Sequence, residues 1–199
     1  MPYKMIINEL LYSNDTNVRL ALVKACRCKD INDYSMMLGK LAEDPEEIVR
    51  METANVLIAG KNRGTRCRNI LHELAHDPSD KIRLTIAKSG IDPSLFVNDE
   101  NSAVRAAAVR TCKTCGDLLL FIKDPNIDVI KAVIDMCKDQ TDPIRNTILD
   151  RYMQENHTDV KKEIAMIGYR IHDLLQDNSG EVRNAAKKYL NIMIPASKQ

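Results

Sequence analysis

The chain has 199 residues, of which 44% are apolar and 29% are charged, so it has the length and composition of a soluble domain with a full-sized core. This balance excludes disordered, collagen-like and low-complexity architectures. The 29 Lys and Arg residues nearly cancel the 28 Asp and Glu residues, and the formal net charge of +1 gives no global attraction to nucleic acid or to an anionic membrane.

The sequence contains no segment typical of a membrane span or a secretion signal. No apolar run approaches the roughly 20 residues that a bilayer span requires. The opening MPYKMIINELLYSND breaks its apolar stretch too early for a signal peptide. We therefore expect a cytoplasmic protein without a membrane partner, whose six cysteines are thiols rather than disulfides.

A recurring segment predicts helix starts along the chain. Four segments place Asp six residues before Arg, with Val or Ile directly before that Arg: Asp44–Arg50, Asp77–Arg83, Asp99–Arg105 and Asp177–Arg183. Degenerate copies are centred on Val18-Arg19, Val129-Ile130, Ile144-Arg145 and Val160-Lys161. Asp accepts hydrogen bonds from the free N–H groups of a first helical turn, and Pro fits the first helical position. We therefore expect each Asp, or Asp-Pro pair, to begin a helix.

Apolar residues on both sides of each Asp recur with the spacing of amphipathic helices. After the Asp, the series are Val18, Leu22 and Cys26; Val104, Ala108 and Cys112; Val129, Val133 and Cys137; and Val182, Ala186 and Leu190. Before the Asp, they are Leu38, Leu41 and Ala42; Leu71, Leu74 and Ala75; Leu118, Phe121 and Ile122; and Ile171, Leu174 and Leu175. Before Asp99 only Leu95, Phe96 and Val97 follow Pro93, so a single-turn first helix is predicted there.

Each unit is thus a helix, a turn and a second helix, and neither helix can cover its apolar face alone. Stacking of neighbouring units covers both faces, which is the arrangement of a solenoid. We predict an all-α fold in a single α-solenoid domain over residues 1–199. Irregular repeats are expected over about 138–168, where the anchor spacing shortens, and a capping helix over about 179–194.

The repeated units resemble two related families of helical repeats. The segments VRLALVKAC, IRLTIAKSG and VRAAAVRTC, preceded by stretches such as MLGKLAEDPEEIV, are similar to HEAT repeats. The shorter units resemble the leucine-rich repeat variant, which pairs an α-helix with a 3₁₀ or short α-helix. The resemblance covers about Asn14 to Leu190. It implies a curved, right-handed α-solenoid superhelix, used mostly as a protein-binding scaffold and in a few related folds to bind nucleic acid or modify DNA bases.

The segment His72-Glu73-Leu74-Ala75-His76 satisfies the H-E-x-x-H signature of zinc metalloproteases. In that signature two histidines one helical turn apart bind Zn²⁺, and the glutamate activates its water. The same columns of the repeat hold unrelated residues in other units, such as Gly39, Lys40 and Glu43. Ser79 and Ile82 also replace the glycine and histidine of the extended motif. We therefore rank a zinc metalloenzyme third among the candidate functions.

Cysteines occur at two spacings that could serve metal or redox chemistry, Cys26-x-Cys28 and Cys112-x-x-Cys115. Cys26, Cys112 and Cys137 stand seven residues after the anchor, in a column that leucine fills in other units. We therefore interpret them as small buried apolar residues and predict no metal and no cofactor.

The anchor column is basic in seven of eight units and predicts either of two structures. One is a structural ladder, in which each cation bonds the Asp or the turn carbonyls of a neighbouring unit. The other is a positive stripe that meets an acidic partner or a phosphate backbone. An accompanying acidic column favours the ladder. The basic residues are Arg19, Arg50, Arg83, Arg105, Arg145, Lys161 and Arg183, with Ile130 the exception, and the acids are Asp44, Asp77, Asp99, Asp124, Asp139, Glu155 and Asp177.

One local run, residues 61–68, contains four basic residues and no acid: Lys61, Arg63, Arg66 and Arg68. These are the candidate partner-binding residues. Nucleic-acid binding is disfavoured because the chain lacks Trp and has only 4% aromatic residues to stack on bases. We predict a non-enzymatic scaffold or adaptor that binds another protein, with no catalytic residue. The alternative is a nucleic-acid-binding module that uses this loop and the arginine column.

Overall fold

The computed structural model describes residues 2–28, 30–60, 64–138, 143–155 and 157–193. Within these ranges the regular secondary structure is entirely helical, with thirteen α-helices, three short 3₁₀ helices and no strand. The predicted all-α fold is therefore confirmed. Contacts between residues divide the chain into two compact units, Met1–Phe96 and Val97–Gln199.

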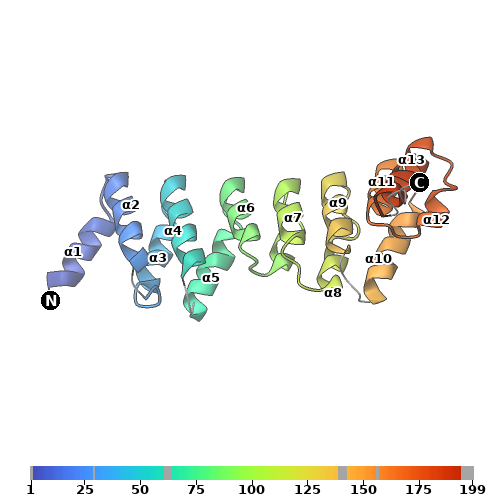
Figure 1. Ribbon diagram of the computed structural model, residues 1–199. Helices are drawn as coiled ribbons and strands as arrows, with labels where there is room; N and C mark the ends of the chain where they lie inside the picture. The colour runs from blue at the N-terminus through green and yellow to red at the C-terminus, as the bar shows by residue number, and fades with distance from the viewer. Residues whose placement is uncertain (1, 29, 61–63, 139–142, 156, 194–199) are drawn as a thin grey trace. The chain divides into compact units, whose positions relative to one another are not determined.

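The unit Met1–Phe96 consists of three consecutive pairs of helices (Figure 1). The second helix of each pair lies beside the second helix of the next, and the first helices adjoin one another in the same way. The pairs are α1 (Pro2–Leu11) with α2 (Thr16–Ala25), α3 (Ser35–Ala42) with α4 (Glu47–Ala59), and α5 (Thr65–Leu74) with α6 (Asp80–Lys88). Two 3₁₀ helices, η1 (Cys26–Cys28) and η2 (Pro93–Phe96), complete this unit.

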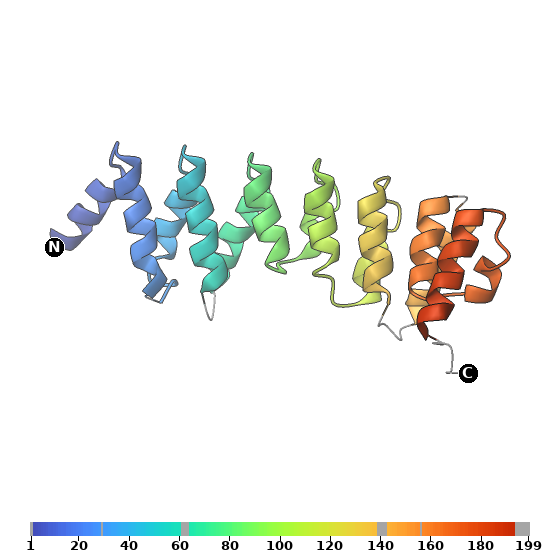
Figure 2. The ribbon, with the colours of Figure 1, turned by 45° about the horizontal axis from the view of Figure 1, so that its top comes forward.

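The unit Val97–Gln199 repeats this arrangement, although two of its first helices are only four residues long. Its second helices, α7 (Ser102–Val109), α9 (Ile127–Met136), α11 (Thr158–Met166) and α13 (Gly180–Met193), lie side by side in that order (Figure 2). The first helices are α8 (Cys115–Leu118) continued by η3 (Leu119–Phe121), then α10 (Pro143–Gln154) and α12 (Ile171–Leu174).

The helices begin later than the sequence predicted. Asp44 Oδ1 accepts a hydrogen bond from the Glu46 amide over 2.9 Å, but the N-cap of α4 is Glu46, and Pro45 lies before it. The same displacement occurs where Asn126 caps α9, two residues after Asp124. The expectation that each Asp-Pro pair starts the helix is therefore wrong. The Asp instead closes a short turn before the cap, because its carboxylate bonds the amide two residues on.

The segment around Ile144 and Arg145 is not a further copy of the second helix. Both residues lie in α10, which packs as a first helix against α11. Its twelve residues make it longer than the other first helices of this unit. The short anchor spacings near residues 138–168 therefore arise because a first helix carries the Ile-Arg pattern, while residues 139–142 and 156 lie outside the described ranges.

The predicted apolar columns form the interior of each unit. The Leu, Val and Cys residues that recur around each turn are mostly buried, including Leu38, Leu71 and Val129. Phe96, from the single-turn helix η2, is fully buried, as expected for a short first helix. Tyr152 of α10 is also fully buried, and its hydroxyl has no hydrogen-bond partner among the described residues.

A tight loop joins α11 to α12. Gly168 has a positive φ of 74°, and the space where a Cβ would stand is occupied by the ring of Tyr189 from α13. The next residues fasten the loop to α10, because the Tyr169 hydroxyl donates to Asp150 Oδ1 over 2.8 Å. Only glycine combines this backbone conformation with so close an approach of a neighbouring ring.

Candidate partner-binding surface

Basic side chains of the second helices connect successive repeats in Met1–Phe96. Arg19 donates from Nε to Asp44 Oδ2 over 2.6 Å and from Nη2 to Asp44 Oδ1 over 2.9 Å. Arg50 binds Asp77 in the same bidentate way, over 2.7 and 3.1 Å. Planar guanidinium groups suit this geometry. The two aspartate side chains are only 4% and 3% exposed, so these arginines are committed to the neighbouring repeat.

The same arginines also fasten the turn of their own repeat. Arg19 Nη1 donates to Ser13 O over 2.7 Å, and Arg50 Nη1 donates to Asp44 O over 2.9 Å. Arg83 Nη1 makes the equivalent bond to Asp77 O, also over 2.9 Å. Arg19 and Arg50 therefore each join two turns, and we call the repeated set of pairs the arginine–aspartate ladder.

The ladder recurs in Val97–Gln199. Arg105 binds Asp124 over 2.6 and 3.0 Å, and its Nη1 also donates to Asp99 O over 2.7 Å. Lys161 replaces arginine further along and donates to Asp177 over 2.9 Å. In both units, members of the basic column thus form structural pairs with a neighbouring repeat, the interpretation that the sequence favoured.

Three members of the predicted column depart from this pattern. Arg183 donates from Nη1 to Asp177 O and Asn178 O of its own turn, over 2.6 and 2.9 Å, and makes no ion pair with a neighbouring repeat among the described residues. Ile130 of α9 has no charge, and a more exposed pair, Lys131 with Glu163 at 3.4 Å, joins α9 and α11 instead. Arg145 belongs to α10, and its Nε donates to Cys137 O over 2.7 Å. The departure of Arg145 follows from its position on a first helix rather than on a second one.

The pairs change the proton affinity of the ladder residues. Burial acts to raise the pKa of Asp44, but hydrogen bonds from Arg19 and from the Glu46 amide outweigh it and hold that pKa below its usual value. The bond to Asp44 raises the pKa of Arg19 in turn. For Asp177, the Ser179 amide is the main cause of a lowered pKa. These carboxylates are therefore ionised partners and not candidate proton donors.

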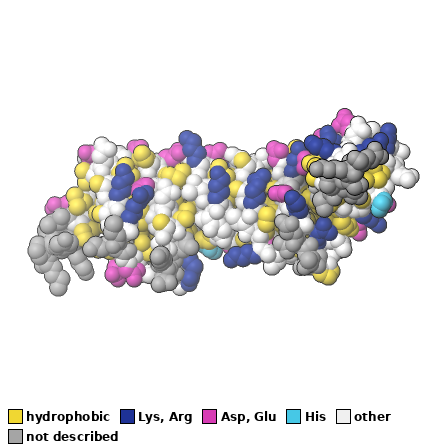
Figure 3. Space-filling view, viewed as in Figure 1, with side chains coloured by type: hydrophobic (Ala, Val, Ile, Leu, Met, Phe, Trp, Pro, Cys, Tyr) yellow, Lys and Arg dark blue, Asp and Glu magenta, His cyan; other side chains and the backbone are white. Residues whose placement is uncertain are grey.

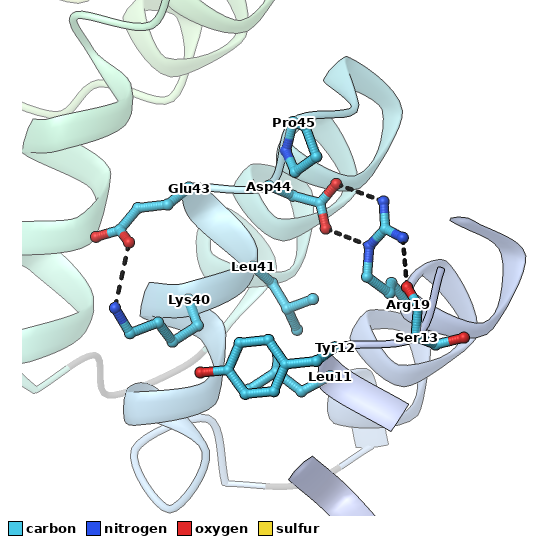
Figure 4. A pocket seen from close by; sticks show the side chains of 9 residues that line it. All are labelled: Leu11, Tyr12, Ser13, Arg19, Lys40, Leu41, Glu43, Asp44 and Pro45. Carbon is cyan, nitrogen blue, oxygen red and sulfur yellow. Dashed lines mark hydrogen bonds and ion pairs between the residues drawn. The ribbon is translucent and has the colours of Figure 1, made fainter. Parts of the chain in front are cut away.

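Grooves lie between successive turns, with a ladder pair in the wall of each. The first groove has a volume of about 370 Å³, and Figure 4 shows the Arg19–Asp44 pair at one end and the exposed Lys40–Glu43 pair at the other. Between them lie apolar side chains and the exposed Tyr12. The full lining is Leu11, Tyr12, Ser13, Arg19, Lys40, Leu41, Glu43, Asp44 and Pro45.

Two further grooves have the same construction. The second, of about 350 Å³, is lined by Ala42, Glu43, Asp44, Arg50, Glu73, Leu74, His76, Asp77 and Pro78. The third, of about 370 Å³, lies within Val97–Gln199 and is lined by Val97, Asn98, Asp99, Arg105, Leu120, Phe121, Lys123, Asp124 and Pro125. These grooves were not predicted from the sequence, although the residues at their rims, four and one positions before each ladder Asp, vary visibly between repeats.

The second helices of Met1–Phe96 also present an exposed face. It carries Ile48, which is 56% exposed, together with the half-buried Met51 and the exposed Lys24 and Lys88. In Figure 3 acidic side chains lie along the upper edge of this part, where the second helices begin. Acidic residues near helix starts and basic residues near helix ends match the helix dipole. This face therefore combines apolar area with charge of both signs.

The predicted basic site is only partly within the described residues. Arg66 and Arg68 lie in the first turn of α5 and are exposed. Lys61 and Arg63 lie outside the described residues. The first turn of α5 is fastened from another repeat, because Asn32 Oδ1 accepts a hydrogen bond from the Gly64 amide over 2.7 Å.

The H-E-x-x-H segment does not form the helical pair of histidines that its motif requires. Helix α5 ends at Leu74, so His72 lies in its last turn while His76 lies beyond its C-cap, Ala75. Glu73 and His76 both line the second groove, and no cluster of three metal-ligating side chains was found within the described ranges.

The cysteines have the environment that their column predicted. Cys26, Cys112 and Cys137 are buried and not disulfide-bonded. Burial raises the pKa of their thiols to about 11, 12 and 12 respectively. Such groups are poor thiolates at neutral pH and serve as packing residues.

No helix in the described part of the chain is long and apolar enough to cross a lipid bilayer. Comparison of the sequence with protein-family models gave no match, and comparison with curated proteins gave no significant one.

Proposed function

We propose that the protein is a cytoplasmic, non-enzymatic scaffold, a right-handed α-solenoid of HEAT-like repeats that binds another protein. The observation that carries this proposal is the arginine–aspartate ladder, which holds second helices such as α2 and α4 side by side. Helices fixed in this way offer a broad, preorganised face to a partner.

Two features of the second-helix face support protein recognition. Ile48 is apolar and exposed, and Met51 lies half-buried beside it on the same helix. Flexible and apolar side chains of this kind are common in the central part of protein interfaces. Lys24 and Lys88 place positive charge near the ends of α2 and α6, where a polar rim is expected.

The test is partner capture by the full-length chain with matched surface variants. The chain is immobilised, incubated with native lysate of its own source and crosslinked, and retained proteins are quantified. Ile48→Glu should reduce retention of the bound protein at least about tenfold, because a charge replaces buried apolar contact. Met36→Glu is the control, since Met36 is 70% exposed but lies on the first helix α3. Loss of retention in the Met36 variant alone, or no specific retention at all, would refute the proposal.

Nucleic-acid binding is the alternative, and exposed Arg66 and Arg68 are the observation that favours it. A mobility shift with DNA and RNA at increasing salt separates the two functions. A nucleic-acid-binding module should lose affinity steeply with salt and on changing both arginines to Ala. The scaffold predicts no such shift.

A further inference from the structure

The three grooves have the same construction but differ in some of their side chains. Side chains at equivalent positions can therefore be compared from one groove to the next. Their walls share a ladder aspartate followed by proline and an apolar residue three positions before that aspartate. Two rim positions differ. Four residues before the aspartate stand Lys40, Glu73 and Leu120 in the first, second and third grooves, and directly before it stand Glu43, His76 and Lys123.

Leu120 is an apolar residue at a position that carries charge in the other two grooves. Its side chain lines the third groove and is 47% exposed, and the adjacent Leu119 is 40% exposed. Lysine and glutamate occupy the equivalent positions, so folding does not require an apolar residue there. Half-buried Val97 adds a second apolar side chain to the lining of this groove. The position of Leu120 therefore adds exposed apolar surface to the third groove and not to the other two, and an apolar side chain of a ligand can pack against it.

The third groove also has one available charge. Asp124 is bound on both carboxylate oxygens by Arg105, which leaves the pair neutral. Asp99 is half-buried, and its Oδ1 accepts the Asn101 amide over 2.8 Å. Lys123 is the exposed charged residue of the lining, and it has no ion-pair partner among the described residues. A ligand group that meets this rim is therefore favoured if it is negative.

We propose that the third groove binds an extended segment of the partner protein in which an apolar side chain stands within two residues of a carboxylate. The apolar side chain would pack against Leu120 and Val97, and the carboxylate would pair with Lys123. A volume of about 370 Å³ has room for one or two side chains and not for a folded element. This inference rests on the proposed scaffold function and names the chemistry of one contact.

The experiment uses a phage-displayed library of random eight-residue peptides, selected on the full-length chain. Enriched peptides are synthesised with a fluorescent label, and their Kd is measured by anisotropy. They should share an aliphatic or aromatic residue within two positions of Asp or Glu. Leu120→Lys and Lys123→Glu install the residues of the first groove, which that groove shows to be compatible with the fold. Each should weaken binding about tenfold or more, because contact area or the ion pair is lost.

Two controls separate recognition from folding. Lys123→Arg keeps the charge and should hold Kd within about threefold, and Lys40→Glu alters the same position of the first groove and should leave Kd unchanged. The inference is overturned if no such motif is enriched, or if neither Leu120→Lys nor Lys123→Glu changes the Kd. If that occurs while Ile48-dependent capture persists, the scaffold function stands. If peptides bind the groove but no protein is captured from the lysate, the chemistry inferred for the groove stands, and the proposed use of the second-helix face is refuted.

Discussion

Removing one member of a ladder pair should destabilise the unit Met1–Phe96 far more than removing a surface ion pair. The Arg50–Asp77 pair is the best target, because its side chains are 14% and 3% exposed and its two contacts span 2.7 and 3.1 Å. Asp77→Ala leaves the guanidinium without its carboxylate and frees the Ser79 amide, which Asp77 also binds. Breaking a buried pair in this way costs about 3–5 kcal/mol.

A double-mutant cycle isolates the pair from these secondary losses. We expect Arg50→Met with Asp77→Ala to be less destabilised than the two single changes added together, by about 1.5 kcal/mol or more. Urea denaturation followed by circular dichroism gives each free energy of unfolding. The control is Lys40→Ala with Glu43→Ala, whose exposed side chains lie 3.3 Å apart and should couple by about 0–1 kcal/mol. Equal coupling in both cycles would refute the structural role of the ladder.

Three further changes test the fold. Tyr152→Phe should leave stability unchanged or raise it by about 1 kcal/mol, since the buried hydroxyl lacks a partner among the described residues, and a fall in the urea midpoint would contradict this. Gly168→Ala should lower the melting temperature, because the Tyr189 ring fills the space of a Cβ and φ is positive; an unchanged melting temperature would mean that the loop can rearrange. The pKa of Asp44 is lowered in the folded protein, so the ionised carboxylate stabilises the fold at pH values above 3.8, its ordinary pKa. This contribution should vanish as the pH falls through the lower pKa of the folded state. In acid titrations of stability Asp44→Asn should therefore lose part of the dependence near and below pH 3.8, and parallel curves would exclude that role.

The periodic parts of this fold could be predicted from the sequence because the buried apolar residues recur with the spacing of a helix. Leu38, Leu71 and Cys137 were expected to face inward from their columns, and all three are buried. The helix starts were misplaced by two or three residues, because an Asp that caps a helix and an Asp that closes the preceding turn have the same local sequence. Their geometry differs only once Arg19 has approached Asp44 from the neighbouring repeat.

The candidate site was harder to predict than the core. The candidate residues predicted from the sequence were Lys61, Arg63, Arg66 and Arg68, because they cluster along the chain. The grooves instead bring together turns that are separated in sequence, such as Ser13 with Glu43 or Val97 with Lys123. The column that contains Leu120 varies between repeats and could be placed away from the apolar stripe. The width of a groove, however, depends on how far apart consecutive turns stand, which one sequence does not show.

Ile130 stands where other repeats carry a ladder cation, so local stability is unevenly distributed within Val97–Gln199. The interface of α7 with α9 includes the Arg105–Asp124 pair, and that of α11 with α13 includes the Lys161–Asp177 pair. Between α9 and α11 the charged contact is instead the more solvent-exposed Lys131–Glu163 pair. In an array whose cohesion comes from neighbour to neighbour, the weakest junction sets where partial opening begins. Amide hydrogens of α10 and α11 should therefore exchange through a sub-global event that leaves α7 and α9 protected.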